Sequence, residues 1–536
     1  MGASLTGTTL IKSLLLGSAA GIVAVTFAQA ADLPTRKAAP VDYVKVCNVG
    51  GITGWTLPGS DTCLKFSGFV TAQFAGGNLN TQYNWAGSPI YSTITGVTLP
   101  AAISAAATPR LLVAASNAQQ NTTFYRETTG WSTRVNFGFD MASNTAYGPL
   151  IGHFDFNADV SNGFDPIQPT PINNIVYLNT GYVTWAGITA GMAQSFFSFT
   201  AGGDNFSNFF SPDRKGYNEP LLLAYTASFG GGFTATLSAE SPGSVGASGG
   251  GTQMTGAGGL NQGPIGGFEP GNITFGGQRW PDIVGSLHMK QGWGEAQVSG
   301  VIHNVNVSDN SFDNTAVCGA DFASVCNGRE NKVGWGADAG VKVNLPSFGD
   351  GDNVLLTGAY TQNATWYSGI PDGMWGENGQ VNGNGQPLYL ADAFFNPITN
   401  TWAKPTAWSV SVLVEHHFTP QFYIDLEGAI SGVNWSNQGG CGGVAVLNGV
   451  CPLSAIGGPL SPSAFTWIAG ADLGWNPVTN LNFDLELMYQ AVNQETPIGA
   501  LGTVYSLGEA NQVFVPGAWQ GNSNGFAGRL RITRYF

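Results

Sequence analysis

The chain has 536 residues and a formal net charge of −14, although only 10% of its residues are charged and 77 are glycine. This composition is too rich in glycine and too poor in charge for an ordinary cytosolic enzyme. The acidic balance also argues against nucleic acid as a partner, because nucleic-acid-binding proteins present clustered Lys and Arg. An acidic chain favours a role in which cations are attracted.

The N-terminus has the features of a secretory signal. Lys12 precedes an apolar run over residues 14–27, and Ala-Gln-Ala at residues 28–30 supplies a small-residue cleavage site. A short membrane anchor is the alternative, but the run is short and ends at this motif. Beyond it, no stretch approaches the ~18 unbroken apolar residues of a membrane helix. We expect residues 1–30 to be removed, so that the mature chain begins at Ala31.

Residues 31–63 form an irregular lead-in, and the first two of six cysteines lie in it. Six cysteines allow many connectivities, but in an exported chain nearest-neighbour pairing across loops is the economical interpretation. The expected disulfides are Cys47–Cys63, Cys318–Cys326 and Cys441–Cys451. None of these spacings is a C-x-x-C pair, so zinc binding and thioredoxin-type redox chemistry are not expected.

Polar and apolar residues alternate from residue 64 onward. Over residues 131–141, Arg134, Asn136 and Asp140 alternate with apolar or small residues, which is the period of a strand with one dry and one wet face. Residues 150–159 repeat the pattern after a turn, so the two strands form a hairpin. A soluble sandwich also alternates, but this aromatic-rich face needs a second apolar medium. Alternating segments of about ten residues are typical of a transmembrane β-barrel.

The pattern predicts about sixteen strands, joined alternately by short turns and long loops. The expected strands are residues 64–74, 131–141, 150–159, 175–185, 188–196, 221–229, 233–240, 282–290, 295–306, 332–345, 354–362, 408–418, 422–430, 467–476, 481–490 and 524–536. A closed sheet of this size leaves an aqueous channel, and closure removes edges that lipid could not satisfy with hydrogen bonds. We therefore expect an all-β fold, a transmembrane antiparallel barrel over residues 64–536.

Residues 197–220 interrupt the alternation with a loop rich in phenylalanine and acid. Its candidate functional residues are Asp204, Asp213, Glu219, Phe206, Phe209 and Phe210. A loop that exposed the three rings to water would forgo roughly 1.5 to 3 kcal/mol of burial for each. We expect the rings to anchor the loop against the barrel interior, where its acids would constrict the lumen.

Charged residues on the predicted wet faces fall into two groups. The basic group, expected on the first, second and last strands, is Lys65, Arg126, Arg134, Arg529 and Arg531. The acidic group is Asp282, Asp338, Asp425, Glu427, Asp472, Asp484 and Glu486. A basic wall facing an acidic loop would create a transverse field that selects among solutes; alternatively, these charges only solvate the lumen. Because the acids outnumber the bases, we expect a weak to moderate cation preference.

Catalysis and metal binding have little support in the sequence. His416 and His417 are adjacent in a strand, so their side chains point to opposite faces and cannot chelate one ion together. The same-face carboxylate pairs Asp425 with Glu427 and Asp484 with Glu486 could serve acid/base chemistry, but selectivity is the favoured role in a hydrated lumen. We expect no enzymatic activity, no cofactor and no bound metal.

Several stretches carry a family resemblance. They are KSLLLGSAA at residues 12–20, YVKVC at 43–47, PGSDTCLKFSG at 58–68, GMAQSFF at 191–197, AYTASFGGG at 224–232 and the terminal Phe536. They are similar to the general porins of alphaproteobacteria, of the rhizobial type, and they are spread over most of the chain. The resemblance implies a homotrimer of sixteen-stranded barrels in the outer membrane, in contact with lipid and lipopolysaccharide. It also implies that the third external loop, here residues 197–220, folds into the pore.

The favoured function is passive diffusion of ions and small hydrophilic solutes. Two alternatives remain: a channel selective for sugars or phosphate, and a barrel whose long glycine-rich loops mediate adhesion. A gated siderophore receptor is disfavoured, because only residues 31–63 separate the signal from the first strand, too few for a plug domain.

Overall fold

Side chains along each long strand alternate between two environments. In β16 (Asn353–Gln362), Leu355, Thr357 and Ala359 are buried, whereas Leu356 and Tyr360 point the other way and are 46% and 47% exposed. Large apolar side chains are therefore on the outside, and the polar ones are mostly on the inside. This inversion of the usual soluble pattern is that of a barrel facing lipid and enclosing a polar interior.

The structure is a computed structural model. It describes residues 45–77, 91–93, 110–112, 129–163, 175–200, 219–241, 273–275, 279–309, 329–369, 380–381, 386–387, 392, 394–396, 401–435, 463–494, 502–506, 512–516 and 522–536. The expected signal (residues 1–30) and the pairs Cys318–Cys326 and Cys441–Cys451 lie outside these residues.

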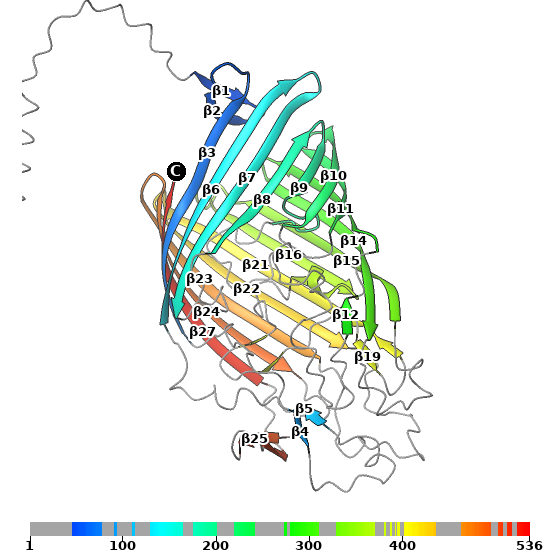
Figure 1. Ribbon diagram of the computed structural model, residues 1–536. Helices are drawn as coiled ribbons and strands as arrows, with labels where there is room; N and C mark the ends of the chain where they lie inside the picture. The colour runs from blue at the N-terminus through cyan, green and yellow to red at the C-terminus, as the bar shows by residue number, and fades with distance from the viewer. Residues whose placement is uncertain are drawn as a thin grey trace, which may run out of the picture. The chain divides into compact units, whose positions relative to one another are not determined.

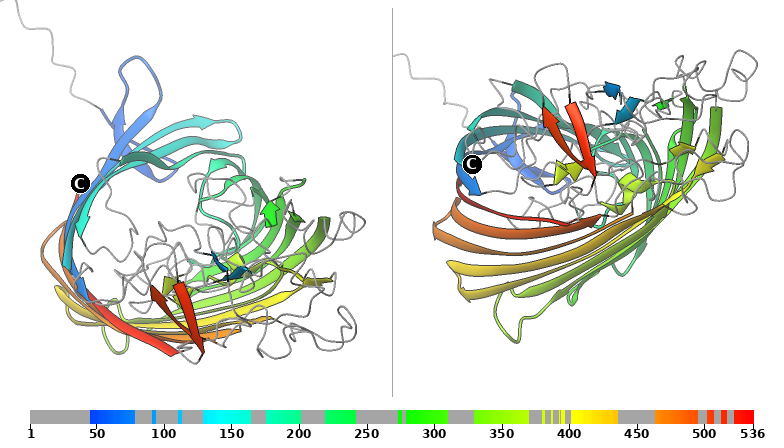
Figure 2. Two further views of the ribbon diagram at one scale, coloured as in Figure 1. Left: turned by 60° about the horizontal axis from the view of Figure 1, so that its bottom comes forward. Right: turned by 90° about the horizontal axis from the view of Figure 1, so that it is seen from below.

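Sixteen antiparallel strands form a closed ring (Figures 1 and 2). They are β3 (Cys63–Gly77), β6 (Thr129–Thr145), β7 (Gly148–Gly163), β8 (Ile175–Trp185), β9 (Ile188–Met192), β10 (Leu221–Gly230), β11 (Phe233–Glu240), β13 (Asp282–Gln291), β14 (Gly294–Asp309), β15 (Arg329–Asn344), β16, β21 (Pro405–Thr419), β22 (Phe422–Trp435), β23 (Ala464–Val478), β24 (Leu481–Gln494) and β27 (Asn522–Tyr535). Each pairs with its neighbours in this order, and β27 pairs with β3 to close the ring. The prediction of about sixteen strands in a transmembrane barrel is confirmed.

The remaining short elements lie at the N-terminal lead-in and in the loops. They are β1 (Val46–Val49), β2 (Ile52–Thr56), β4 (Tyr91–Thr93), β5 (Arg110–Leu112), β12 (Ile273–Phe275), β17 (Gln380–Val381), β18 (Gln386–Pro387), β19 (Phe394–Asn396), β20 (Thr401–Ala403), β25 (Gly502–Ser506), β26 (Gln512–Pro516) and the 3₁₀ helix η3 (Thr365–Ser368). The part of the chain that the structure describes contains no helix with the length and apolar character needed to cross a bilayer.

One end of the barrel carries short turns and the other carries long connections. Between β8 and β9 the turn is only Ala186 and Gly187, both with positive φ (52° and 85°), the conformation that tight hairpins require. At the opposite end, the connections after β11, β16 and β24 span tens of residues. In outer-membrane barrels the short turns are periplasmic and the long loops are extracellular.

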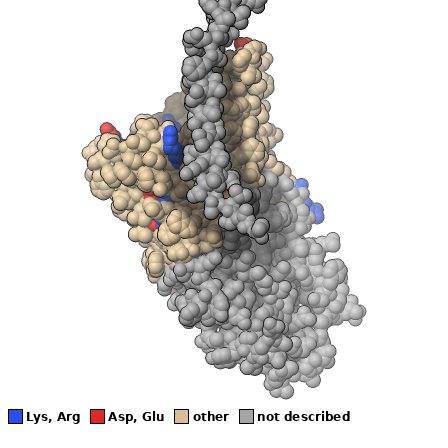
Figure 3. Space-filling model, turned by 60° about the vertical axis from the view of Figure 1, so that its left-hand side comes forward, with Lys and Arg blue, Asp and Glu red and all other residues tan. Residues whose placement is uncertain are grey.

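Two rows of outward aromatic rings mark the ends of the apolar outer surface. Near the short turns, Phe422 stacks on Trp475 with ring centroids 5.7 Å apart. Near the loop end, Trp131 contacts Phe74 and Trp467 contacts Tyr489. On the face in Figure 3, the described surface carries few charged side chains. Aromatic rows flanking an apolar band are the membrane-interface girdles of such barrels.

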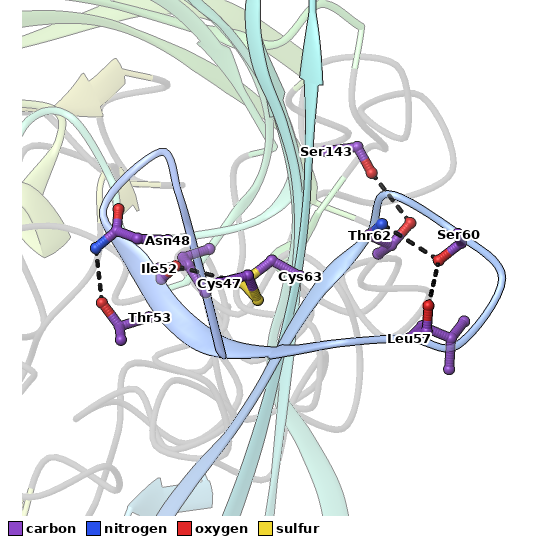
Figure 4. Close-up of a disulfide and its surroundings, with 9 residues drawn as sticks. All are labelled: Cys47, Asn48, Ile52, Thr53, Leu57, Ser60, Thr62, Cys63 and Ser143. Atoms are coloured by element: carbon purple, nitrogen blue, oxygen red, sulfur yellow. Dashed lines mark hydrogen bonds between the residues drawn. A yellow bond between two sulfur atoms is a disulfide. The ribbon is translucent and has the colours of Figure 1, made fainter. Parts of the chain in front are cut away.

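The lead-in is tied to the barrel by the disulfide Cys47–Cys63, with Cα atoms 5.8 Å apart (Figure 4). It contains two paired strands, β1 and β2, and is thus more regular than the sequence suggested. At Thr62, a hydroxyl contact with Ser143 of β6, 3.1 Å long, adds a second link (Figure 4). The start of β3 is therefore linked covalently to β1 of the lead-in and, through Thr62, by a hydrogen bond to β6.

One predicted strand ends early. We expected residues 188–196 to be extended in the wall, but β9 stops at Met192. Beyond it, the backbone N–H of Phe196 and the hydroxyl of Ser195 both donate to Glu240, at 3.1 and 2.6 Å. The chain leaves the wall because an inward carboxylate of β11 holds it, a contact across 45 residues that local alternation does not encode.

Candidate functional site

The inner surface carries a row of charges that crosses four neighbouring strands. The strand registers align Asp425 of β22 with Asp472 of β23, then Glu486 of β24, then Arg529 of β27. Each of the four side chains is at most 1% exposed. Three acids in line with one arginine concentrate negative potential on this wall. Like charges directly opposite one another are also destabilising.

Arg529 ends this row by pairing with an acid. Its Nε lies 2.6 Å from Oε2 of Glu486, and both side chains are almost fully buried. Two register positions further along, at the next inward pair, Arg531 lies opposite Asp484. On their other side, β27 pairs with β3, where Ala75 and Gln73 occupy the corresponding positions. The two arginines therefore lie between the acidic wall and two uncharged positions of β3, Ala75 and Gln73.

Tyr423 belongs to the same wall. Its hydroxyl donates to Oδ1 of Asp484 at 2.8 Å and accepts from Nδ2 of Asn482 at 3.0 Å. Glu427, two positions from Asp425 on the inward face of β22, is also buried. The five acids of this wall, which are Asp425, Glu427, Asp472, Asp484 and Glu486, thus outnumber its arginines.

The second charged region lies on β6, β7 and β8. Arg134 makes a two-pronged ion pair with Asp159, with Nε to Oδ1 at 2.7 Å and Nη2 to Oδ2 at 2.8 Å. The Tyr177 hydroxyl contacts both partners. Bidentate guanidinium–carboxylate pairs are short, strong and geometrically fixed. The charge of Arg134 is therefore paired with an acid on the neighbouring strand of the same wall.

Lys65 lies in register with Asp140 on the inward faces of β3 and β6. Asp140 also contacts Nδ1 of His153 on β7 at 2.6 Å. Lys65 remains exposed. Among the described members of the predicted basic group, it presents its charge most openly.

The predicted constriction loop is described only at its two ends. Its last residue, Pro220, lies beside the end of β9, because the N–H of Ala193 donates to the carbonyl of Pro220 at 3.2 Å, next to the half-buried Glu219. The carbonyl of Phe197 accepts from Oγ of Ser299 at 2.5 Å and from Nε2 of Gln297 at 3.2 Å, both on the inward face of β14. The loop therefore begins inside the barrel.

Glycines on the inward face of β15 leave room for the loop's first rings. A Cβ on Gly340 would lie 2.3 Å from the ring of Phe199, and one on Gly336 would lie 3.5 Å from that of Phe197. A side chain at Gly340 would occupy the space of Phe199. The wall is thus recessed where the loop enters the lumen.

The remaining predicted site residues fall into two classes. Asp282 and Asp338 are buried on the inward faces of β13 and β15. Arg126, Asp204, Asp213, Phe206, Phe209 and Phe210 lie outside the described residues. Among the described residues the structure therefore brings Arg529 together with Glu486, and Arg134 with an acid that was not predicted.

Several charged residues on the lumen wall were not singled out from sequence, including Asp159, Glu240 and His303. All three lie at inward positions of strands that the alternation predicts. The signal was available, since any charge in phase with a wet face belongs to the lumen. Their partners depend on strand register and could not be read locally. Within the described parts of the chain, no group of three His, Cys, Asp or Glu side chains has an arrangement that could hold a metal ion.

Comparison with known proteins agrees with this geometry. The family model described as "Porin subfamily" matches residues 32–521, most of the chain. The chain belongs to the porin family. Porin Omp2a of Brucella ovis is 26% identical over 422 residues, covering 78% of this chain and 97% of the relative. Porin Omp2b of Brucella abortus (strain 2308) is 26% identical over 442 residues, covering 80% and 94%.

Among solved structures, the outer membrane channel DcaP of Acinetobacter baumannii is similar, with a TM-score of 0.48 and 11% identity, covering 90% of this chain and 99% of that one. Family membership and the closed barrel together identify an outer-membrane porin channel, which accords with a channel rather than an enzyme.

Proposed function

We propose that this porin is a passive diffusion channel for ions and small hydrophilic solutes, with a weak to moderate preference for cations. The row Asp425, Asp472, Glu486 and Arg529 carries the proposal, since it aligns three acids with one base. A lumen lined by an excess of one sign of charge concentrates the opposite ion and repels its own.

We also propose that residues 197–220 form the constriction. The buried Phe197 and its hydrogen bonds to β14 support this, because they direct the chain into the lumen from its first residue. The acids Asp204, Asp213 and Glu219 are the loop residues that would act on passing ions. Arg134 and Arg529 each pair with an acid of their own wall, whereas Lys65 is exposed, so Lys65 is the described base that we place opposite the loop acids.

The proposed mature protein begins at Ala31 after export, and residues 64–536 form the barrel of a homotrimer embedded among lipid and lipopolysaccharide. The family resemblance supports the trimer. The exposed rings Phe66 and Phe137, next to the seam between β27 and β3, supply apolar surface on which a second copy could pack.

The selectivity is tested by reversal potentials of the purified channel in a planar bilayer with a salt gradient. We expect a cation-selective sign, reduced in the double variant Asp425→Asn with Asp472→Asn and unchanged in Asp61→Asn, which removes an exposed acid of the lead-in. The preference should weaken as salt rises, because charges are screened over a Debye length of ~10 Å at 0.1 M.

An anion-selective sign in the parent protein would contradict the proposal. A well-folded barrel without conductance steps would instead favour the adhesin alternative, and saturable conductance blocked by a sugar or phosphate would favour the solute-selective one.

A further inference from the structure

A buried polar cluster lies at the loop end of the barrel, away from the acidic wall. His303 of β14 lies between two carboxylates, with Nδ1 2.7 Å from Asp282 and Nε2 3.2 Å from Asp392. The hydroxyl of Tyr367 donates to the same Asp282 at 2.6 Å. All four side chains are at most 1% exposed. A neutral imidazole donates from one nitrogen only, so holding both carboxylates needs the doubly protonated ring.

The cluster joins the wall to a segment that has left it. Asp282 and His303 point inward from neighbouring strands, whereas Tyr367 belongs to η3 and Asp392 to the connection between β16 and β21. In the sheet, β15 separates β16 from β14 and β13. Tyr367, which follows β16 in the chain, passes over the inner side of β15 to reach them. It packs there against Val284 and Val301, which face the lumen from β13 and β14.

Hydrogen bonds fix this segment along its length. Nδ2 of Asn363 donates to the carbonyl of Asp392 at 2.8 Å, and the N–H of Thr365 donates to its Oδ1 at 2.5 Å. At the other end, Oγ of Ser409, an inward residue of β21, donates to the carbonyl of Ser368 at 2.5 Å. Residues 363–369 are thus held on the lumen side of three strands.

The same segment contacts the start of the constriction loop. The rings of Phe197 and Tyr367 meet edge to face, with centroids 4.9 Å apart, and both side chains are fully buried. Edge-to-face pairs of this kind are favourable beyond the area they bury. Phe197 is therefore clamped between β14, which binds its carbonyl, and Tyr367, which covers its ring.

We infer that residues 363–369, with Asp392, form a second inward-folded element of the pore, which fixes the entry of loop 197–220 and helps to set the cross-section of the channel. Tyr367 is the contact residue between the two elements. His303 is a positioning residue that holds Asp392 directly and Tyr367 through Asp282. This inference rests on the channel function proposed above, and it adds a determinant of pore size outside the proposed constriction loop.

The test compares the full-length protein with Tyr367→Ala, Tyr367→Phe and His303→Gln. Single-channel conductance and the exclusion limit for sugars in liposome swelling are measured on barrels that retain their heat-shifted mobility. Tyr367→Ala and His303→Gln should both raise conductance and admit larger sugars, and Tyr367→Phe should do so to a smaller extent because it keeps the ring. The control Tyr360→Ala, which removes an exposed ring on the outer face of β16, should leave both readouts unchanged.

Folded variants with the parent's conductance and exclusion limit would overturn the inference. If Tyr367→Ala does not fold, Tyr367→Phe and His303→Gln decide the matter by the same readouts. If the parent itself forms no channel, the proposed function fails first, and chymotrypsin then tests the placement alone. Cleavage after Tyr367 should be slow in the parent and fast in His303→Gln; equal rates would count against the second inward element.

Discussion

Tyr423 reaches across a strand to Asp484, and a glycine makes this reach possible. The ring of Tyr423 lies over Gly474 of β23, where a Cβ would be 1.8 Å from Cζ of the ring. Gly474 is in register with both residues, between them on the inner wall. A side chain there would break the contact that gives Asp484 a hydrogen-bond donor. The acidic wall thus depends on a residue that carries no charge.

Gly474→Ala should therefore lower the stability of the folded barrel. The added methyl must displace the ring of Tyr423, and overpacking of this kind costs roughly 1 to 3 kcal/mol. The temperature at which heat-shifted mobility is lost in detergent measures the effect. Gly285→Ala is the matched control, since a Cβ at this strand position meets nothing within 4 Å. Equal loss of stability in both variants would mean that the contact with Tyr423 is not the cause.

A second single-residue effect depends on pH. Asp352, in the turn between β15 and β16, accepts from the backbone N–H of His417 at 2.8 Å and contacts Nδ1 of His416 at 2.7 Å. The His417 N–H first, and then His416, hold the pKa of Asp352 below its ordinary value of 3.8. A depressed pKa in the folded state stabilises the fold above the unfolded value, and this stability is lost as pH falls through the folded one.

We expect the difference in unfolding midpoint between the parent and Asp352→Asn to be full near neutral pH and to shrink as pH drops below 3.8. Midpoints in denaturant, measured from pH 7 to pH 3, check this. Asp350→Asn, which removes an exposed acid of the same turn, is the control. A difference that stayed constant over this range would show that Asp352 acts without titrating.

Whole elements were more predictable than their contacts. Period-two alternation locates all sixteen barrel strands, because lipid on one side and water on the other impose the pattern on every strand. It also assigns Asp472 and Arg529 to the lumen. It does not pair Glu486 with Arg529, because that contact depends on the register of β24 and β27, which are separated by a long connection. For the same reason it missed the early end of β9 and the role of Glu240.

The loop entry supplies a prediction at the scale of elements. Gly340→Ala would place a methyl 2.3 Å from the ring of Phe199, pushing the start of the loop away from β15 and toward the lumen axis. We expect lower single-channel conductance with normal barrel formation. Gly358→Ala on neighbouring β16 is the control, because its Cβ meets atoms only at 3.4 Å or beyond. An unchanged conductance in Gly340→Ala would show that the position of Phe199 does not influence pore size.

At the scale of the molecule, the barrel satisfies its backbone hydrogen bonds by closure and leaves its apolar area on the outside. Association between copies must therefore use outward side chains. Among the described residues, one run of such rings lies near the seam, where Phe66 contacts Trp55, Phe137 and Phe139 with centroids 4.8 to 5.4 Å apart. Clustered aromatic side chains are the usual anchors of protein interfaces.

We expect the purified protein to have the mass of a trimer by light scattering in mild detergent, and to change to monomer mobility only on heating. The double variant Phe66→Ala with Phe137→Ala should make this change at a lower temperature, because each ring buried between copies contributes roughly 1.5 to 3 kcal/mol. The control Phe422→Ala removes an exposed ring of another strand, β22, whose partner Trp475 lies on the adjacent β23 of the same barrel; it should leave the trimer intact. A parent protein with the mass of a monomer would contradict the prediction of a trimer. If the double variant kept the parent's transition temperature and Phe422→Ala lowered it, the interface would lie on β22 and β23 and not at the seam.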